Sequence, residues 1–140
     1  MYCHLLVKFY FQFMENPKAH QLALTGEKLA VGILKRKGYE ILETNFHSRF
    51  GEIDIIARSH SHIIFVEVKT RTNLNRDLAL EAVTARKQKR ITETAFQYLQ
   101  LHQEYNDFMI QYDIILVFFH EKTNDFSVEH LENAYSFSLL

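Results

Sequence analysis

Charged side chains alternate with apolar ones along two neighbouring segments of the chain, 50–58 and 62–70. Both segments are rich in Ile, Val and Phe and flank a short polar turn, a pattern that predicts an antiparallel hairpin. Folded about the centre of that turn, the hairpin places Asp54 opposite Glu67 on one face, with Lys69 two residues further along. Glu52 faces Lys69 in this register. The other face is then wholly apolar and pairs Ile53 with Val68, Ile55 with Val66 and Ala57 with Ile64.

Two carboxylates on facing strands lie about 5 Å apart at Cβ, and their repulsion is roughly 3 kcal/mol at an effective dielectric near 20. Glu27 is a further candidate neighbour, because helical spacing places it at the border of an apolar stripe. Glu27, Asp54 and Glu67 against Lys69 leave a formal charge of −2, which one divalent cation neutralises. Hard oxygen ligands without Cys or paired His favour Mg²⁺ or Mn²⁺ over Zn²⁺.

A cation held by Asp54 and Glu67 would bind a phosphate oxygen and lower the pKa of a bound water molecule. Lys69 would position that water or stabilise the charge that develops at phosphorus. Together these roles amount to phosphodiester hydrolysis. The same residues also fit a plainer interpretation, a solvated face of salt-bridged strands, and their spacing alone does not separate the two.

A second group of polar side chains crowds the first turns of the helix expected after the hairpin: Arg86, Lys87, Gln88, Lys89 and Arg90. The start of a helix disfavours cations, so phosphate is their natural counterion. Helical spacing turns Lys87 and Gln88 toward the core, within reach of the hairpin acids, and leaves the other three to follow a nucleic-acid backbone. The alternative is a basic helix face that is simply solvated.

The elements that must position these residues follow from the apolar spacing. Helices are expected from Asn16 and Pro17 to Gly38 and over about 84–102. Strands are expected over 39–46, along the two hairpin segments and over 110–119, with one more short strand after Phe126. Helix, three strands, helix, strand (α-β-β-β-α-β) is the order of a single α/β domain.

The domain is expected to occupy residues 21–140, with residues 1–20 as an N-terminal extension. That extension is either an extra strand or helix against the core, or sequence upstream of a true start at Met14. Aromatic side chains gather near both ends of the chain, at Phe9, Phe11, Phe13, Tyr135 and Phe137. They suit a base-stacking platform, core packing or a homodimer surface. Asp113 either supports the acidic site or is buried against an arginine.

Composition restricts the class of protein. With 140 residues, 47% hydrophobic and 24% charged, the chain is neither collagenous nor mostly disordered. Its formal charge of −1 gives no global basic field, so any binding to polyanions must come from local clusters. The lone Cys3 allows no internal disulfide, which suits a reducing compartment, and the apolar start is too short to span a bilayer. We therefore expect a cytoplasmic protein without a membrane partner.

Four motifs in order extend the argument: Gly26-Glu27, RFGEIDIIA at 49–57, FVEVKTR at 65–71 and EAVTARK at 81–87. Together they resemble the YraN-like family of bacterial proteins, which is similar to archaeal Holliday-junction resolvases within the PD-(D/E)xK nuclease superfamily. The resemblance implies a restriction-endonuclease-like core, in which helices flank a mixed central sheet. It also implies an Mg²⁺- or Mn²⁺-dependent endonuclease that acts on DNA, with branched or structured DNA as candidate substrates and a homodimer as a candidate assembly.

The resemblance transfers roles by position. Asp54, Glu67 and Glu27 would be acidic metal ligands and Lys69 the catalytic lysine, while the polar position on the following helix would be Lys87 or Gln88. Ile53 stands where the superfamily motif has a proline that is not a ligand. Two other functions stay open: a non-catalytic nucleic-acid-binding module of the same fold, and an interaction protein that works through its aromatic ends.

Overall fold

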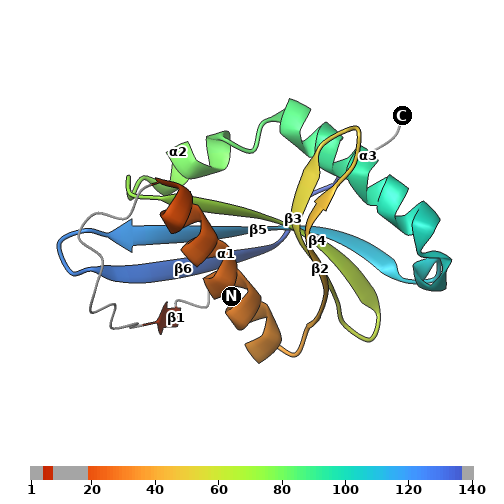
Figure 1. The fold of residues 1–140 in the computed structure, drawn as a ribbon, viewed down its shortest axis with the longest axis horizontal. Coiled ribbons are helices and arrows are strands. Elements are labelled where there is room, and N and C mark those ends of the chain that lie inside the picture. Colours follow the sequence, from red (N-terminus) through yellow and green to blue (C-terminus); the bar gives the residue numbers. More distant parts are fainter. Residues whose placement is uncertain (1–4, 8–18, 137–140) are drawn as a thin grey trace.

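The structure, a computed structural model, describes residues 5–7 and 19–136 and contains one six-stranded sheet (Figure 1). The strand order is β1-β6-β5-β4-β3-β2. β4 and β5 run parallel and the other neighbours run antiparallel, so the sheet is mixed, as expected. The strands are β1 (Leu5–Val7), β2 (Glu40–His47), β3 (Glu52–Arg58), β4 (His62–Arg71), β5 (Met109–His120) and β6 (Asp125–Tyr135).

The helices are α1 (Ala19–Arg36), α2 (Arg76–Glu81) and α3 (Ala85–Leu101), followed by the 3₁₀ turn Gln103–Tyr105. The expected order of helix, three strands, helix and strand is confirmed. The structure adds β1, α2 and a β6 longer than the short strand expected at the C-terminal end. The expected helix entry at Asn16 and Pro17 lies outside the described residues. No helix in the described ranges is long and apolar enough to cross a membrane.

The end of α1 follows from one glycine. Gly38 has a φ of 90°, a left-handed conformation that glycine adopts without steric cost. Its N–H donates to the carbonyl of Lys35, and the N–H of Tyr39 donates to that of Leu34, both at 3.0 Å. This pair of bonds satisfies carbonyls that the helix end would otherwise leave unpaired. The predicted exit at Gly38 is therefore confirmed.

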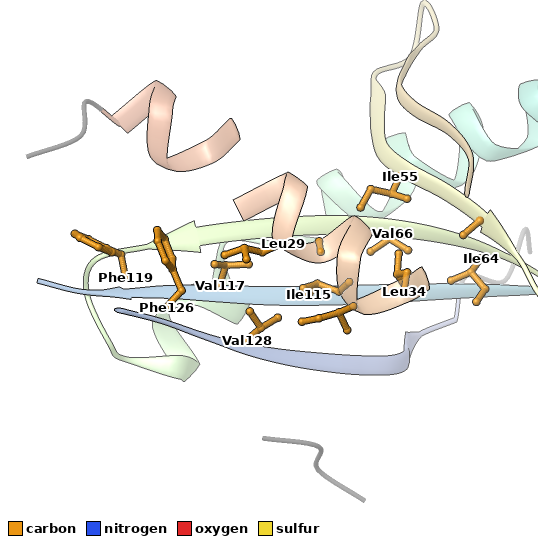
Figure 2. Close-up of a cluster of buried hydrophobic side chains, with 13 residues drawn as sticks. Leu29, Leu34, Ile55, Ile64, Val66, Ile115, Val117, Phe119, Phe126 and Val128 are labelled. Atoms are coloured by element: carbon orange, nitrogen blue, oxygen red, sulfur yellow. The ribbon is translucent and has the colours of Figure 1, made fainter. Parts of the chain in front are cut away.

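Each face of the sheet is covered by a different helix. α1 packs Leu29 and Leu34 onto a cluster that includes Val66 and Val117 (Figure 2). On the opposite face, α3 packs Ile91 and its neighbours against a second cluster, which contains Ile53, Ile56, Ile63, Phe65, Ala95 and Tyr98. Because side chains alternate along a strand, the hairpin strands contribute to both layers.

The predicted hairpin register is confirmed in the half next to the turn, where Ile55 pairs with Val66 and Ala57 with Ile64. The ladder ends at Ile55 and Val66, so the expected pairs further along, among them Asp54 with Glu67 and Glu52 with Lys69, are not part of it.

The prediction that Ile53 shares an apolar face with Ile55 is wrong. Ile53 joins the cluster on the α3 side of the sheet, whereas Ile55 belongs to the cluster on the α1 side. The change of face between Ile53 and Ile55 coincides with an irregular residue on the paired strand β2, where Thr44 pairs with Ile55 and Phe46 with Ile53. Asn45, between them, has a left-handed φ of 52°. A left-handed residue interrupts the regular alternation of a strand, and Asn tolerates this conformation better than most side chains. The irregularity falls beside Asp54.

Candidate active site

The candidate site lies where β3 and β4 stop pairing. Asp54 on β3 is only 7% exposed, and its Oδ2 accepts a hydrogen bond of 2.8 Å from the backbone N–H of Val68 on β4. The carboxylate thus binds a main-chain donor just past the end of the ladder. Glu67, the residue before Val68, is 3% exposed. Two acidic side chains are therefore buried where the two strands separate.

The two oxygens of Glu67 have different environments. Oε1 lies 3.1 Å from the Nζ of Lys69 and 3.2 Å from the Nζ of Lys87. Oε2 is buried and has no hydrogen-bond partner among the described residues. Burial of an unpaired carboxylate oxygen is unfavourable, so natural proteins normally supply such an atom with a donor, a water or a cation. Glu67 therefore has one oxygen neutralised by lysines and one available.

Asp54 is perturbed by the same environment. The pKa of Asp54 is raised from 3.8 to about 7, first by burial and next by the negative charge of Glu67, with smaller contributions from Glu27 and Glu52. The hydrogen bond from Val68 acts in the opposite direction, because it stabilises the ionised form. Without a cation, Asp54 therefore keeps its proton to a much higher pH than an exposed aspartate does.

α1 supplies a third acid through a close approach to β4. Gly26 is buried against Thr70, and a Cβ at Gly26 would lie 1.9 Å from the Thr70 hydroxyl oxygen. Only a residue without a side chain fits this contact. The next residue, Glu27, is half-buried, and its Oε2 lies 3.4 Å from the Nδ2 of Asn45. Glu27 is close enough for its charge to raise the pKa of Asp54.

α3 brings the lysine from the opposite face of the sheet. The Thr84 hydroxyl accepts from the backbone N–H of Lys87 at 3.2 Å, which caps the helix and fixes its rotation. In that rotation the Lys87 side chain reaches Glu67, whereas the Gln88 side chain donates to the carbonyl of Val83. The remaining basic residues of this turn are exposed: Arg86, Lys89 and Arg90.

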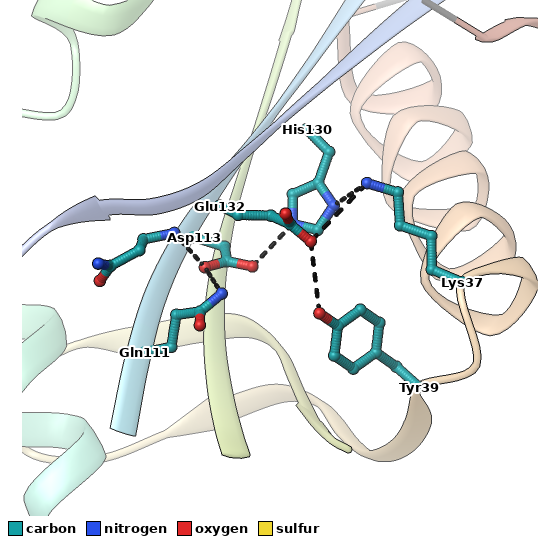
Figure 3. Close-up of polar contacts among 7 residues, drawn as sticks. Lys37, Tyr39, Gln111, Asp113, His130 and Glu132 are labelled. Atoms are coloured by element: carbon teal, nitrogen blue, oxygen red, sulfur yellow. Dashed lines mark hydrogen bonds and ion pairs between the residues drawn. The ribbon is translucent and has the colours of Figure 1, made fainter. Parts of the chain in front are cut away.

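Two acidic residues lie elsewhere. Glu52 pairs with His47 at 3.2 Å on the outer strands. Asp113 belongs to the α1 side of β5, where it forms a buried network with His130 instead of the expected arginine (Figure 3). Lys37 donates to the Nδ1 of His130 at 2.8 Å, so the Nε2 of this ring carries the hydrogen that contacts Asp113 at 2.7 Å. Gln111 also donates to Asp113.

Asp54 and Glu67 are the residues that fit a divalent cation. Over residues 5–7 and 19–136, no three His, Cys, Asp or Glu side chains come together as a ready-made metal site, and Glu27 as a third ligand stays a prediction. Mg²⁺ commonly uses one or two carboxylates and keeps several waters. The unpaired Oε2 of Glu67 and the carboxyl group of Asp54, once ionised, would supply these two carboxylates.

Tyr135 is a site neighbour whose place in the fold was not predicted. Burial raises its pKa, and the charge of Glu67 is the second cause. The Tyr135 hydroxyl is buried and lacks a hydrogen-bond partner within the described part of the chain. The sequence marks Tyr135 only as one of several aromatic residues near the C-terminus, because its position depends on the pairing of β6 with β5.

Comparison with known proteins places this site within a family. Residues 26–117, which include all the candidate site residues named above except Tyr135, match the family described as uncharacterised protein family UPF0102. A UPF0102 protein of Acinetobacter baumannii strain AYE is 40% identical over 128 residues, covering 84% of this chain and 96% of that relative. One of Caldicellulosiruptor bescii is 39% identical over 115 residues, covering 82% of this chain and 97% of its own. One of Clostridium botulinum strain Hall is 41% identical over 110 residues, covering 79% and 89%.

Proposed function

The chain belongs to the UPF0102 (YraN) family, and from its site we propose that it is a metal-dependent endonuclease that hydrolyses phosphodiester bonds in DNA. One observation carries the proposal. Glu67 is almost fully buried, with one oxygen between two lysines and the other unpaired, beside an aspartate that burial keeps partly protonated. Buried acids with perturbed ionisation are expensive in free energy and are typical of catalytic sites.

Asp54 and the Oε2 of Glu67 would hold Mg²⁺ or Mn²⁺, and Glu27 would add negative charge from α1. When bound, the cation supplies Lewis acidity at a phosphate oxygen and a lowered pKa for a bound water. The Val68 N–H holds the side chain of Asp54, and the two lysines hold that of Glu67. Release of the Asp54 proton accompanies cation binding.

Lys69 and Lys87 act on the phosphate. Lys69 is mostly buried, with 15% of its side chain exposed, and its contact with Glu67 fixes the Nζ beside the acids. From there it orients the attacking water and stabilises the negative charge that grows on the phosphoryl oxygens as the new P–O bond forms and the old one breaks. Lys87 is more exposed, at 35%, and contacts Glu67 from the other side. It is placed to bind a neighbouring phosphate oxygen.

The exposed side chains of Arg86, Lys89 and Arg90 extend this positive charge over the first turns of α3. Such a stripe binds the phosphate backbone without reading sequence. With a formal net charge of −1, the protein offers a polyanion this local surface and no global field. We therefore propose DNA as the partner and recognition by the shape of the substrate, which suits branched or structured DNA.

The experiment is a cleavage assay on four labelled DNAs: a four-way junction, a flap, a single strand and a plain duplex. Each is incubated with Mn²⁺ or with EDTA, and with the wild-type protein, Lys69→Met, Glu67→Gln and the control Lys122→Met, whose exposed side chain lies in the turn between β5 and β6. The proposal predicts cleavage by the wild type and the control only, and only with metal. Circular dichroism checks that each variant is folded.

DNA binding without cleavage under every condition would overturn the proposed catalysis and favour the non-catalytic module. Neither binding nor cleavage would overturn the assignment to DNA, and a parallel set of RNA substrates then tests the other nucleic acid. Cleavage that survives in Lys69→Met would contradict the role of that ammonium.

A further inference from the structure

A cavity of about 480 Å³ opens beside the candidate active site, on the α3 side of the sheet. Its lining comes from the start of the hairpin at Phe50, from α3 at Thr92 and Phe96, and from the ends of β5 and β6 at Tyr112 and Tyr135. We propose that this cavity is a base-binding pocket that receives one unpaired nucleobase of the DNA strand engaged at the site. The inference rests on the proposed function and names the feature of DNA that the site selects.

The pocket and the catalytic acid share one face of the sheet. Tyr112 on β5 pairs with Phe65 on β4, and Glu67 follows Phe65 by two residues. Two residues along a strand span about 7 Å and return to the same face, so the aromatic floor of the pocket and the carboxylate are neighbours. Tyr135 is close enough to Glu67 for the charge of that acid to raise the pKa of the phenol. A base in the pocket therefore lies on the same face of the sheet as Glu67.

The aromatic rings are already arranged for stacking. The rings of Tyr112 and Tyr135 are 5.4 Å apart at an interplanar angle of 15°, and Tyr112 also stacks on Phe65 at 5.9 Å and 29°. Every nucleobase has a flat π-face, so a pocket walled by fixed aromatic rings accepts any of them. The volume is within the usual range of about 300–1,000 Å³ for sites that hold a small molecule.

The lining is mostly apolar and aromatic, and it also holds polar side chains that suit the edge of a base. Asn133 offers an amide, and Glu93 offers a carboxylate that can accept from an exocyclic amino group.

Two arginines lie near Phe50, and their positive charge suits the phosphate backbone of the strand that carries the base. The guanidinium of Arg49 lies over the ring of Phe50, 4.7 Å from its centroid, and Arg49 is exposed. Gly51 lies against Arg90 of α3, since a Cβ built at Gly51 would be 3.5 Å from the Cβ of Arg90. A backbone that follows Arg90 and Arg49 thus brings its bases to Phe50, which is part of the pocket wall.

The test compares matched DNA ligands by fluorescence anisotropy with EDTA present, so that nothing is cleaved. One duplex carries a single unpaired base and the other an abasic residue at the same position. We expect the wild-type protein to bind the first at least fivefold more tightly. Phe96→Ala removes a pocket ring that is 56% exposed and should abolish most of this preference, whereas Leu101→Ala, 67% exposed on the same helix and outside the pocket lining, should keep it.

Equal affinity for the two duplexes would refute the proposal that the cavity binds a base. An unchanged preference for the unpaired base in Phe96→Ala would refute it as well. If the protein also cleaves DNA, only this inference fails; if it binds no DNA at all, the proposed function fails with it.

Discussion

Replacing Asp54 with Asn should make the metal-free protein more stable above neutral pH. Asn has nearly the same shape, and its side-chain oxygen can still accept the hydrogen bond from the N–H of Val68. Unlike Asp, it cannot ionise. The substitution therefore removes a buried negative charge next to Glu67 while it keeps the local geometry, and catalytic sites commonly sacrifice stability in this way.

The size of the effect follows from the pKa of Asp54, which rises from 3.8 to about 7 on folding. Because the folded pKa is raised, the contribution of this group to stability is fully present below pH 4 and is lost as the pH rises to 7. A tenfold change in the proton affinity of a group on folding corresponds to about 1.4 kcal/mol. Relative to the wild type, Asp54→Asn should therefore gain about 4 kcal/mol in free energy of unfolding between pH 4 and pH 8.

Urea unfolding followed by circular dichroism, at several pH values and with EDTA, measures this difference. Asp107→Asn is the control, because Asp107 is exposed and lies outside the candidate site. Saturating Mg²⁺ should stabilise the wild type but not Asp54→Asn. If the variant is less stable than the wild type at pH 8 in EDTA, the ionised Asp54 is well accommodated and the reasoning about its burial is refuted.

Two further substitutions test the supports of the site. Gly26→Ala should cost about 1–3 kcal/mol of stability, because its Cβ would collide with Thr70. Gly32→Ala on the same helix meets no atom within 4 Å and should be neutral or stabilising. Equal stability of the two variants in chemical denaturation would contradict the close contact of α1 with β4. His130→Ala should cost about 2 kcal/mol, because it removes one of the donors to the fully buried Asp113 and leaves Gln111 and the N–H of Asn133 as its other donors, and a second change of Asp113 to Asn should recover part of the loss. A loss below 1 kcal/mol in the single variant would show that the network contributes little.

The sequence predicts those parts of the fold that depend on local pattern. The expected helix over 84–102 is observed as Ala85–Leu101, between the caps Thr84 and His102. The predicted register of the hairpin is also correct in the half next to the turn, because a slip by one residue would place apolar side chains in solvent. The short helix α2 was not predicted, because a six-residue helix carries too little periodicity to be recognised.

The parts that were not predictable depend on single residues or on distant pairing. Ile53 changes face beside the left-handed Asn45 of the paired strand, and no periodicity signals that conformation. The choice between Lys87 and Gln88 was open because neighbouring residues on a helix differ by only about 100°, and the cap at Thr84 sets the rotation that brings Lys87 to Glu67. The pocket beside the site requires β6 to pair with β5, a contact between segments far apart in the sequence.

The central claim is that Asp54 and the unpaired oxygen of Glu67 together hold one divalent cation. Isothermal titration of the purified protein with Mn²⁺ at pH 8, where Asp54 is mostly ionised, measures this directly. We predict one site per chain in the wild type, with binding lost in Asp54→Ala and in Glu67→Gln and weakened at pH 6 by competition with the Asp54 proton. Equal Mn²⁺ binding by the wild type and both variants would contradict the account.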